Sequence, residues 1–215
     1  LFGSHELMAR GINATPDTFL DVFGAALDHL VPAEVLPAGA SAPVREVVWE
    51  GADADLNRLP IPRHFEQDAG AYITAGMIAA RDPDTGVGNL AYARCQVTGP
   101  RRLGVSLHSR QHTWDYLRRA EARGQDLPVA VVIGAHPAVM LAGAAKMGIG
   151  EDEYDLAGAL IGQPLQLAPG CTVDVPVPAT AEIVIEGKLL ANVRETEGPF
   201  GEYTGYVTGR STHNV

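Results

Sequence analysis

Cysteine and long apolar runs are both scarce in this sequence. Its 215 residues include two cysteines, Cys95 and Cys171. Two cysteines cannot supply the disulfide framework of a small secreted domain, so we expect a reducing, cytoplasmic location. No apolar run reaches the roughly 18 residues of a membrane-spanning helix, and no signal peptide is recognisable. The sequence therefore predicts a cytoplasmic protein without a membrane span.

Positive charge is also scarce. Sixteen Lys and Arg residues face 26 Asp and Glu residues, which gives a net charge of −10. Because there is no run of Lys or Arg, a nucleic-acid-binding surface is excluded. Neither common Gly-rich phosphate loop is present, so NAD and ATP lack support. An anionic ligand would have to be held by a few placed cations or by a metal ion.

What remains is an ordinary globular composition, with 46% hydrophobic and 20% charged residues. The length allows one large domain, or one and a half small ones. Strand patterns joined mostly by short turns, with helices between them, predict an α+β fold with a predominantly antiparallel sheet or barrel. The sequence starts at Leu1 rather than Met and stops after Val215, and we expect it to be a piece of a longer chain.

Helices are predicted from apolar periodicity and from end signals. Thr15-Pro16-Asp17 combines a capping hydroxyl, a first-turn proline and an acid, which is typical of a helix start. Gly124 would end another helix. The expected helices span about 16–30, 113–123, 137–146 and 153–161.

Strands are predicted where β-branched and aromatic residues gather between turn signals. We expect strands at 45–50, 72–80, 93–98, 103–107, 129–133 and 180–186. The segments 93–98 and 103–107 flank Gly99-Pro100-Arg101-Arg102 and should form a hairpin. Gly187-Lys188 is expected to turn the chain into a partner strand of 180–186.

The segment 197–206 (EGPFGEYTGY) draws attention first, because two carboxylates flank Gly-Pro-Phe-Gly. Proline excludes a regular helix, and the glycines allow a sharp turn or a close approach to a ligand. Neighbouring carboxylates push their pKa values apart, so Glu197 and Glu202 could transfer protons. The alternative is a surface turn with two solvated glutamates.

Two more polar segments are candidates for binding a ligand. In 89–94 (NLAYAR), Arg94 stands on an otherwise apolar strand, where a buried guanidinium needs an anion; an exposed edge position is the alternative. On a straight strand Asn89 and Arg94 point oppositely, and a bulge or bend would bring them together. The segment 108–112 (HSRQH) joins a strand to a helix, where His112 is either a metal ligand or a residue flanking the helix.

Acidic residues open the helix at Glu153, where the helix dipole alone favours them. Nothing in the pattern singles out one of Glu151, Asp152, Glu153 and Asp155. Asn, His and a carboxylate would nevertheless form a credible ligand set for Mn²⁺ or Mg²⁺, completed by a phosphate oxygen.

Taken together, these motifs resemble the UbiD family of reversible decarboxylases, which use prenylated FMN. The resemblance covers essentially the whole sequence and the intervals agree: 5 from Asn89 to Arg94, 18 from Arg94 to His112, and 5 between the glutamates. The matching segments are 89–94 (NLAYAR), 111–112 (QH), 153–154 (EY), 197–206, and, in addition, 59–62 (LPIP) with 68–74 (DAGAYIT).

The resemblance implies a split β-barrel like that of flavin reductases, flanked by helices, with residues 1–50 as the end of an N-terminal α/β segment and connector and 51–215 as the cofactor domain. It implies that Arg94, Glu197 and Glu202 are catalytic, and that Glu202 protonates the product. The implied metal ligands are Asn89, His112 and Glu153. The implied cofactor-binding residues are Asn89, Tyr92, Arg94, Gln111, His112, Lys146 and Glu153.

The resemblance also implies a substrate and partners. The substrate would be an α,β-unsaturated or (hetero)aromatic carboxylic acid, the metal Mn²⁺ or Mg²⁺, with K⁺ as a further ion. A flavin prenyltransferase would supply the cofactor, and the full-length protein would be a homo-oligomer. Family members are about twice as long, so their C-terminal domain would lie outside this sequence.

One segment departs from the family pattern. Ala144-Ala145-Lys146-Met147 stands where the family often has Ser-Met-Pro, so the phosphate and K⁺ contacts are expected to differ, with Lys146 meeting the phosphate directly. Two other functions stay open: a flavin-binding fragment or subunit without independent catalysis, and a two-carboxylate hydrolase such as a glycosidase. The hydrolase leaves Asn89, Arg94 and His112 unexplained.

Overall fold

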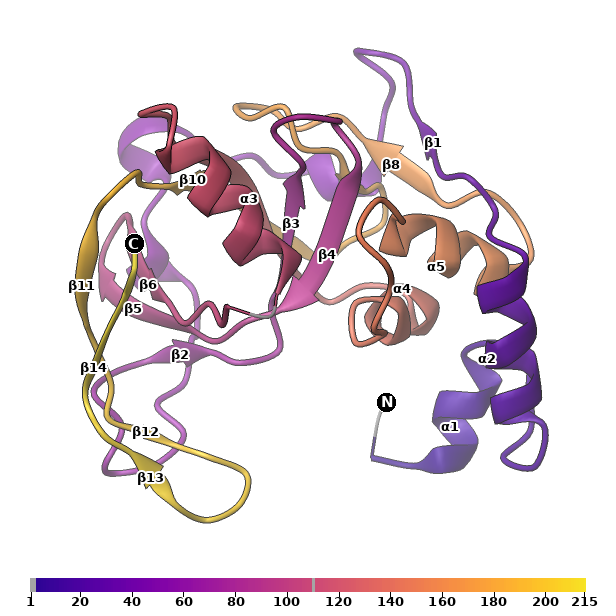
Figure 1. Ribbon diagram of the computed structural model, residues 1–215, viewed down its shortest axis with the longest axis horizontal. Helices are drawn as coiled ribbons and strands as arrows, with labels where there is room; N and C mark the ends of the chain where they lie inside the picture. Colours follow the sequence, from indigo (N-terminus) through magenta and orange to yellow (C-terminus); the bar gives the residue numbers. More distant parts are fainter. Residues whose placement is uncertain (1–2, 110) are drawn as a thin grey trace.

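The structure is a computed structural model that describes residues 3–109 and 111–215. Arg110, part of the polar segment 108–112, lies outside the described residues. The expected fold class is confirmed. Helices and mostly antiparallel strands form an α+β fold, and the strands divide between separate open sheets, as in a split barrel (Figure 1).

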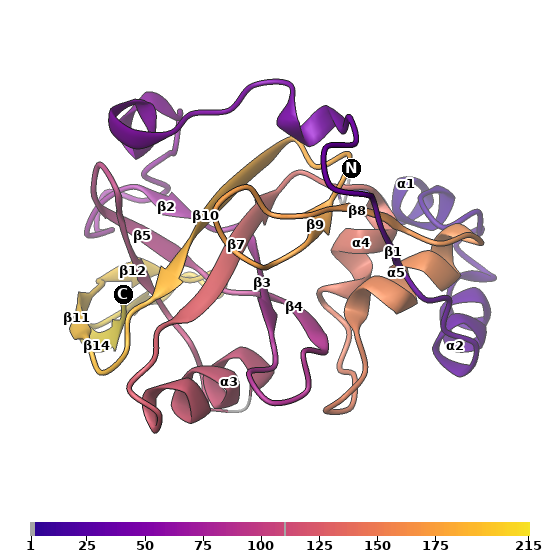
Figure 2. The same ribbon diagram turned by 90° about the horizontal axis from the view of Figure 1, so that it is seen from above.

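The central sheet has the strand order β10-β7-β3-β4, and its neighbouring strands are all antiparallel. Figure 2 shows these strands side by side. Their bounds are β3 (Met77–Arg81), β4 (Gly88–Tyr92), β7 (Leu127–Ile133) and β10 (Ile183–Leu189). Strand β7 confirms the strand expected at 129–133.

The second sheet has the order β11-β14-β6-β5-β2. Its strands are β2 (Tyr72–Ile73), β5 (Cys95–Gly99), β6 (Arg102–Val105), β11 (Arg194–Glu197) and β14 (Ser211–Asn214). The expected hairpin is β5–β6. Smaller sheets join β1 (Glu34–Val35), β8 (Gln166–Ala168) and β9 (Val177–Pro178), and join β12 (Phe200–Gly201) to β13 (Val207–Thr208).

Helices cover the central sheet from two sides (Figures 1 and 2). The α-helices are α1 (His5–Arg10), α2 (Phe19–Asp28), α3 (His112–Glu121), α4 (Pro137–Ala142) and α5 (Glu153–Ile161). Short 3₁₀ turns occupy Pro43–Arg45, Gly51–Asp53 and Leu56–Arg58. Helix α5 has the bounds that the sequence predicts, 153–161. Asp152 caps it by accepting the Tyr154 N–H at 2.9 Å, and Gly162 ends it at φ 84°.

The core lies on both faces of the central sheet because side chains alternate along a strand. On β3, Met77 and Ala79 join the cluster under α4 and α5. Ile78 and Ala80 join the cluster between this sheet, α3 and the second sheet. The sheet is therefore a buried layer, and the functional side chains can gather only at its ends.

Three sequence expectations about strands are wrong. Residues 46–50 form no strand, and Val47 and Val48 are exposed, because β-propensity alone provides no partner strand. The run 72–80 is split into β2 and β3, which belong to different sheets. Its break contains Gly76, where a Cβ atom would lie 2.8 Å from side-chain carbons of Ile73 and Val131.

The third wrong expectation is the turn at Gly187-Lys188. Both residues continue β10 and pair with Val129 and Pro128 of β7. The chain turns later, near Asn192, whose φ is 59°, and β11 then pairs with β14 instead of β10. Two helices are shorter than expected: α2 spans Phe19–Asp28 and so begins after Thr15-Pro16-Asp17, and α4 ends at Ala142.

An ionic cluster fixes α3 against the turn between β3 and β4. Arg119 of α3 donates to both carboxylate oxygens of Asp82, at 2.8 and 2.9 Å, and also to Asp84. Asp82 is 5% exposed. The hydrogen bonds from Arg119 hold the pKa of Asp82 below its ordinary value, against the effect of burial. This contact positions the first turn of α3, which carries His112.

We expect Asp82→Asn to lower the free energy of unfolding by roughly 2–3 kcal/mol at pH 7, because Arg119 loses its buried anionic partner. The folded-state pKa of Asp82 lies below the unfolded value, so its contribution is present above the unfolded pKa and is lost as pH falls. Urea denaturation at several pH values measures this. The wild-type minus variant difference should shrink on acidification, and Asp174→Asn, at an exposed ion pair, should change little.

Candidate active site

Arg94 lies where the chain crosses between the two sheets. It follows β4 and precedes β5, and neither strand includes it. The crossing carries the chain out of β4, but it does not bring the two residues together as the sequence allowed: Asn89 lies near the start of β4, and Arg94 follows its end. Arg94 is thereby directed at the C-terminal segment rather than into the core.

Arg94 contacts both glutamates of the segment 197–206. Its Nε and one terminal nitrogen donate to the two carboxylate oxygens of Glu197, at 2.9 and 3.0 Å. The other terminal nitrogen donates to Glu202 at 2.6 Å. Burial alone would lower the pKa of Arg94, but Glu197 and Glu202 raise it, so the guanidinium stays charged. The alternative of two solvated glutamates is excluded by the burial of Glu197, and the solvent-facing arginine is excluded by its two partners.

The two glutamates differ in their surroundings. The side chain of Glu197 is 1% exposed, and that of Glu202 is 34% exposed. The Phe200 ring lies under the Arg94 guanidinium, 4.8 Å from its carbon to the ring centre. Glu197 is therefore a fixed counter-ion of Arg94, whereas Glu202 keeps a path to solvent.

Three residues that sequence reasoning did not select complete this cluster. His213 Nε2 lies 3.3 Å from Glu197, and burial lowers the pKa of His213 although Glu197 raises it. The Gln96 side-chain oxygen accepts from the Tyr72 hydroxyl and from the Gly198 N–H, each at 3.2 Å. A buried glutamine inside a strand is unusual, and that polarity was the signal available in the sequence.

Asn89 and the Glu153 carboxylate both lie along β4, away from Arg94. The Asn89 amide nitrogen donates to the Thr113 hydroxyl at 2.9 Å, next to His112 at the start of α3. One carboxylate oxygen of Glu153 accepts the Leu90 N–H at 2.7 Å. Segments far apart in sequence thus converge on β4, and the Asn89 amide oxygen is the atom left to act as a ligand.

Glu153 is a buried carboxylate whose hydrogen bonds come from the backbone. It is 3% exposed, and burial raises its pKa to about 7, to which the charges of Asp152 and Glu151 contribute. Its hydrogen bonds come from backbone N–H groups rather than from a Lys or Arg. Asparagine and glutamate oxygens with a histidine imidazole are a donor set that suits a divalent cation, so the residue types fit the predicted metal.

Across the described ranges, no three His, Cys, Asp or Glu side chains group as a metal site. The predicted set has two of these residue types plus asparagine, so it stays a prediction. Gln111 donates to the Tyr92 carbonyl at 3.1 Å, and the Tyr92 hydroxyl donates to the Met140 carbonyl at 3.3 Å. Lys146 is exposed beyond the end of α4. The cofactor-binding roles of these three residues also stay predictions.

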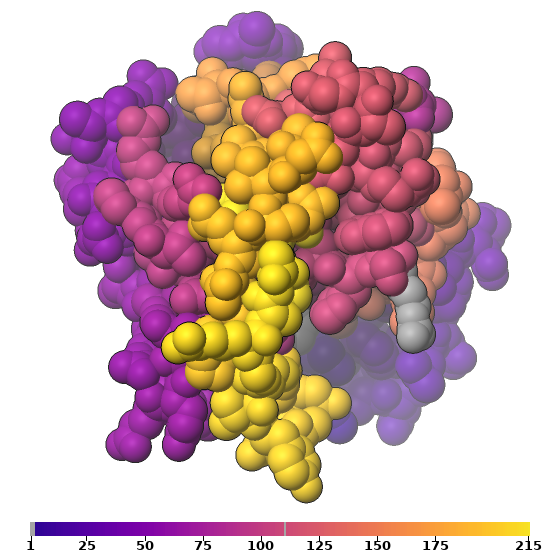
Figure 3. All heavy atoms as spheres, turned by 60° about the vertical axis from the view of Figure 1, so that its left-hand side comes forward, coloured from indigo at the N-terminus to yellow at the C-terminus, as the bar shows by residue number. Residues whose placement is uncertain are grey.

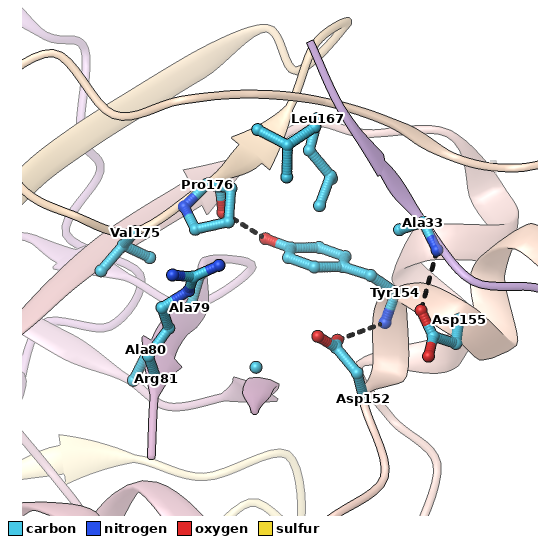
Figure 4. Close-up of a pocket in the computed structure, with 12 residues that line it drawn as sticks. Ala33, Ala79, Ala80, Arg81, Asp152, Tyr154, Asp155, Leu167, Val175 and Pro176 are labelled. Atoms are coloured by element: carbon cyan, nitrogen blue, oxygen red, sulfur yellow. Dashed lines mark hydrogen bonds between the residues drawn. The ribbon is translucent and has the colours of Figure 1, made fainter. Parts of the chain in front are cut away.

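Two cavities lie outside the cluster around Arg94. The smaller one, of about 130 Å³, lies behind Glu153 and is lined by residues that include Arg81, Asp152 and Tyr154 (Figure 4). It is far below the roughly 300–1,000 Å³ of cofactor-sized pockets. The larger one, of about 930 Å³, lies between β10 and residues 44–59. Neither cavity is lined by Arg94, Glu197 or Glu202, so neither one is part of the site around Arg94.

The surface beside the paired strands β11 and β14 is a further candidate for the functional site. In the space-filling view the segment that ends in β14 lies across the front of the molecule, and the surface is hollowed beside it, toward α3 (Figure 3). No helix in the part of the chain that the structure describes is long and apolar enough to cross a membrane.

The sequence matches one family model, described as UbiD: 3-octaprenyl-4-hydroxybenzoate carboxy-lyase Rift-related domain, over residues 37–215. Among characterised proteins it is 48% identical to anhydromevalonate phosphate decarboxylase of Methanothermobacter thermautotrophicus over 156 residues, which are 73% of this chain and 36% of that protein. It is 38% identical to phenolic acid decarboxylase of Streptomyces sp. (strain D7), over 78% of this chain and 36% of that protein.

Solved structures agree. The UbiD-class enzyme HmfF from Pelotomaculum thermopropionicum in complex with FMN superposes with a TM-score of 0.93 at 47% identity, covering 99% of this chain and 47% of the enzyme. Its evolved dimeric form in complex with prFMN gives a TM-score of 0.92 at 47% identity, covering 99% and 49%. Vanillic acid decarboxylase of Sedimentibacter hydroxybenzoicus gives 0.91 at 31% identity, covering 99% and 47%. This chain spans less than half the length of each relative.

We expect Glu197→Gln to lower the free energy of unfolding by roughly 2–3 kcal/mol, because the Arg94 side chain, 16% exposed, loses its bidentate anion. Glu202→Gln is the matched comparison. Glu202 is one-third exposed, so its replacement should cost less than about 1 kcal/mol. Urea denaturation of both variants at pH 7 measures the difference. Equal losses would contradict the unequal burial described above.

Proposed function

This chain belongs to the UbiD family, and from that premise we propose that it forms the catalytic core of a reversible, non-oxidative decarboxylase. The substrate class is an α,β-unsaturated or (hetero)aromatic carboxylic acid, and the cofactors are prenylated FMN and a divalent metal. The decarboxylase names of the relatives and the flavins bound to HmfF support this proposal.

Arg94 receives the substrate carboxylate in this proposal. Its charge is fixed by Glu197, and its planar donors match a carboxylate. To accept one, the terminal nitrogen that contacts Glu202 exchanges that partner for the substrate. Bound prenylated FMN supplies an electron sink for the electron pair left when CO₂ departs.

Glu202 then delivers a proton to the carbon that has lost CO₂. It is the more exposed glutamate and needs only one contact broken to move, whereas Glu197 is held at both oxygens. In the carboxylation direction Glu202 removes the same proton. The acid is thus the group with freedom to exchange protons with solvent.

Asn89, His112 and Glu153 hold the divalent metal, Mn²⁺ or Mg²⁺, and through it the phosphate of the flavin in our proposal. The observation that favours a cation here is the buried Glu153 carboxylate, whose hydrogen bonds within the described residues come from backbone N–H groups and from no Lys or Arg. Lys146 would contact the phosphate directly, and K⁺ would be a further ion. A cytoplasmic homo-oligomer, loaded by a flavin prenyltransferase, completes the proposal.

A single observation carries this function: Arg94 binds both Glu197 and Glu202, although these glutamates lie 103 and 108 positions further along the chain. A flavin-binding fragment or subunit without independent catalysis is the second candidate, because the chain spans under half of its relatives. Assays of the 215-residue chain alone and mixed with a full-length relative separate the two. Turnover by the isolated chain would exclude the second candidate.

The proposed acid is tested by Glu202→Gln in protein co-expressed with a flavin prenyltransferase. We expect decarboxylation to fall by roughly 10³-fold or more, because the amide cannot donate the proton. The absorbance and mass of the released cofactor should equal those of the wild type. Glu195→Gln, at the exposed Arg102 pair, is the control and should stay active. Full activity of Glu202→Gln would refute the assigned role.

The proposed metal site is tested by Glu153→Gln. Loss of the buried carboxylate should weaken Mn²⁺ binding by roughly 10- to 100-fold, as measured by calorimetric titration with MnCl₂ in the presence of FMN. Glu151→Gln is the matched control. That exposed carboxylate only accepts the Gly148 N–H, so affinity should be unchanged. The assignment would be rejected if both variants bound Mn²⁺ like the wild type.

A further inference from the structure

Asp68 is a buried carboxylate to which the proposed chemistry assigns no role. It is 1% exposed. One carboxylate oxygen accepts the Gly201 N–H at 2.7 Å. The other accepts the N–H groups of His64 and Phe65, at 3.1 and 2.9 Å. Asp68 therefore bridges two segments that are more than 130 residues apart in sequence.

These contacts keep Asp68 ionised. Burial alone would raise its pKa, but the N–H groups of Gly201, Phe65 and His64 lower the pKa below its ordinary value. Each hydrogen bond to a charged oxygen is worth more than a neutral one. A fixed anion thus attracts the backbone of Gly201, the residue that directly precedes Glu202.

Neighbouring contacts strengthen this clamp. The Ala69 N–H donates to the Pro199 carbonyl at 2.8 Å. The Phe65 ring lies so close to Gly201 that a Cβ atom there would be 2.4 Å from a ring carbon. Residues 65–69 therefore grip residues 199–201 at three points.

After Gly201, other groups hold the chain. The Glu202 side chain is held by Arg94, and its N–H begins the exposed turn to Tyr206. Tyr203 is 96% exposed and Tyr206 is 78% exposed. Asp68 is thus the buried charge that fixes the backbone immediately before this exposed turn.

We propose that Asp68 is a positioning residue that holds Glu202 in reach of Arg94 and of the reacting carbon. Without the Gly201 contact, the segment keeps the Ala69–Pro199 hydrogen bond and the pairing of β12 with β13 but loses its charged partner, so Glu202 spends less time in the productive position. Because misplacement by about 1 Å can cost roughly 100-fold in rate, this contact matters for turnover. The kinetic part of the proposal rests on the proposed decarboxylase function.

A first experiment needs no activity. Hydrogen exchange followed by mass spectrometry should show roughly tenfold faster exchange in the 198–208 peptides of Asp68→Asn, with the peptides of β7 unchanged. Asp55→Asn is the matched control, because Asp55 also accepts a backbone N–H, from Asn57, but in a 3₁₀ turn outside the Arg94 cluster. Unchanged exchange in 198–208 would overturn the proposal.

A second experiment uses cofactor-loaded full-length enzyme, with vanillic acid, 3,4-dihydroxybenzoic acid and anhydromevalonate phosphate as probes. Asp68→Asn should lower kcat, normalised to bound cofactor, by roughly 10- to 100-fold while KM stays within about threefold. Asp68→Glu keeps the charge but displaces the oxygens from Gly201. It should fall in the same direction, and it provides the test if the asparagine variant does not fold.

A double-mutant cycle with Glu202→Asp separates positioning from a merely structural role. If Asp68 acts through Glu202, the double variant loses less activity than the product of the two single losses. Independent, multiplying losses would overturn the proposal. If the wild type turns over none of the probes, the decarboxylase function fails for these acids, and the exchange experiment still decides whether the clamp exists.

Discussion

The ion pair between Arg94 and Glu197 is the contact on which the arrangement of this site depends. A guanidinium that is largely removed from water needs an anion, and Glu197 supplies both of its oxygens. The pair joins the crossing between the two sheets to the end of β11. Once it forms, the end of β11 is fixed beside Arg94. Glu202 follows only five residues later, so it can lie only a short distance from the same guanidinium.

The charges near the two ends of β4 are balanced differently. At Arg94, positive and negative groups are matched within the chain. At Glu153, a buried carboxylate has only backbone donors, and burial raises its pKa to about 7. A divalent cation would correct the second imbalance and not the first. In the proposed function, the metal and the phosphate would lie at the Glu153 end of β4, and the carboxylic acid substrate would lie near Arg94.

Local chemistry made part of this predictable from the sequence. The α5 helix was predicted from its apolar periodicity and its acidic first turn, and the β5–β6 hairpin from its turn residues, because those signals act within a few residues. The turn assigned to Gly187 was wrong because pairing with β7 outweighed glycine's preference. Gln96, His213 and the role of Asp68 stayed hidden, since their partners lie far away in sequence. Only a resemblance between whole motifs related the distant clusters to one another.

The spacing of the two glutamates follows from how the four residues between them are used. Gly198, at φ 89°, turns the chain out of β11, and a Cβ there would lie 2.9 Å from the Gly209 carbonyl oxygen. Phe200 lies under Arg94, and Gly201 admits Phe65. A shorter link would lose either the Phe200 ring under Arg94 or the Gly201 hydrogen bond to Asp68. A longer link would hold the Glu202 carboxylate less firmly. One glutamate is thus fixed as a counter-ion, and the other is held at the edge of solvent, as a proton donor requires.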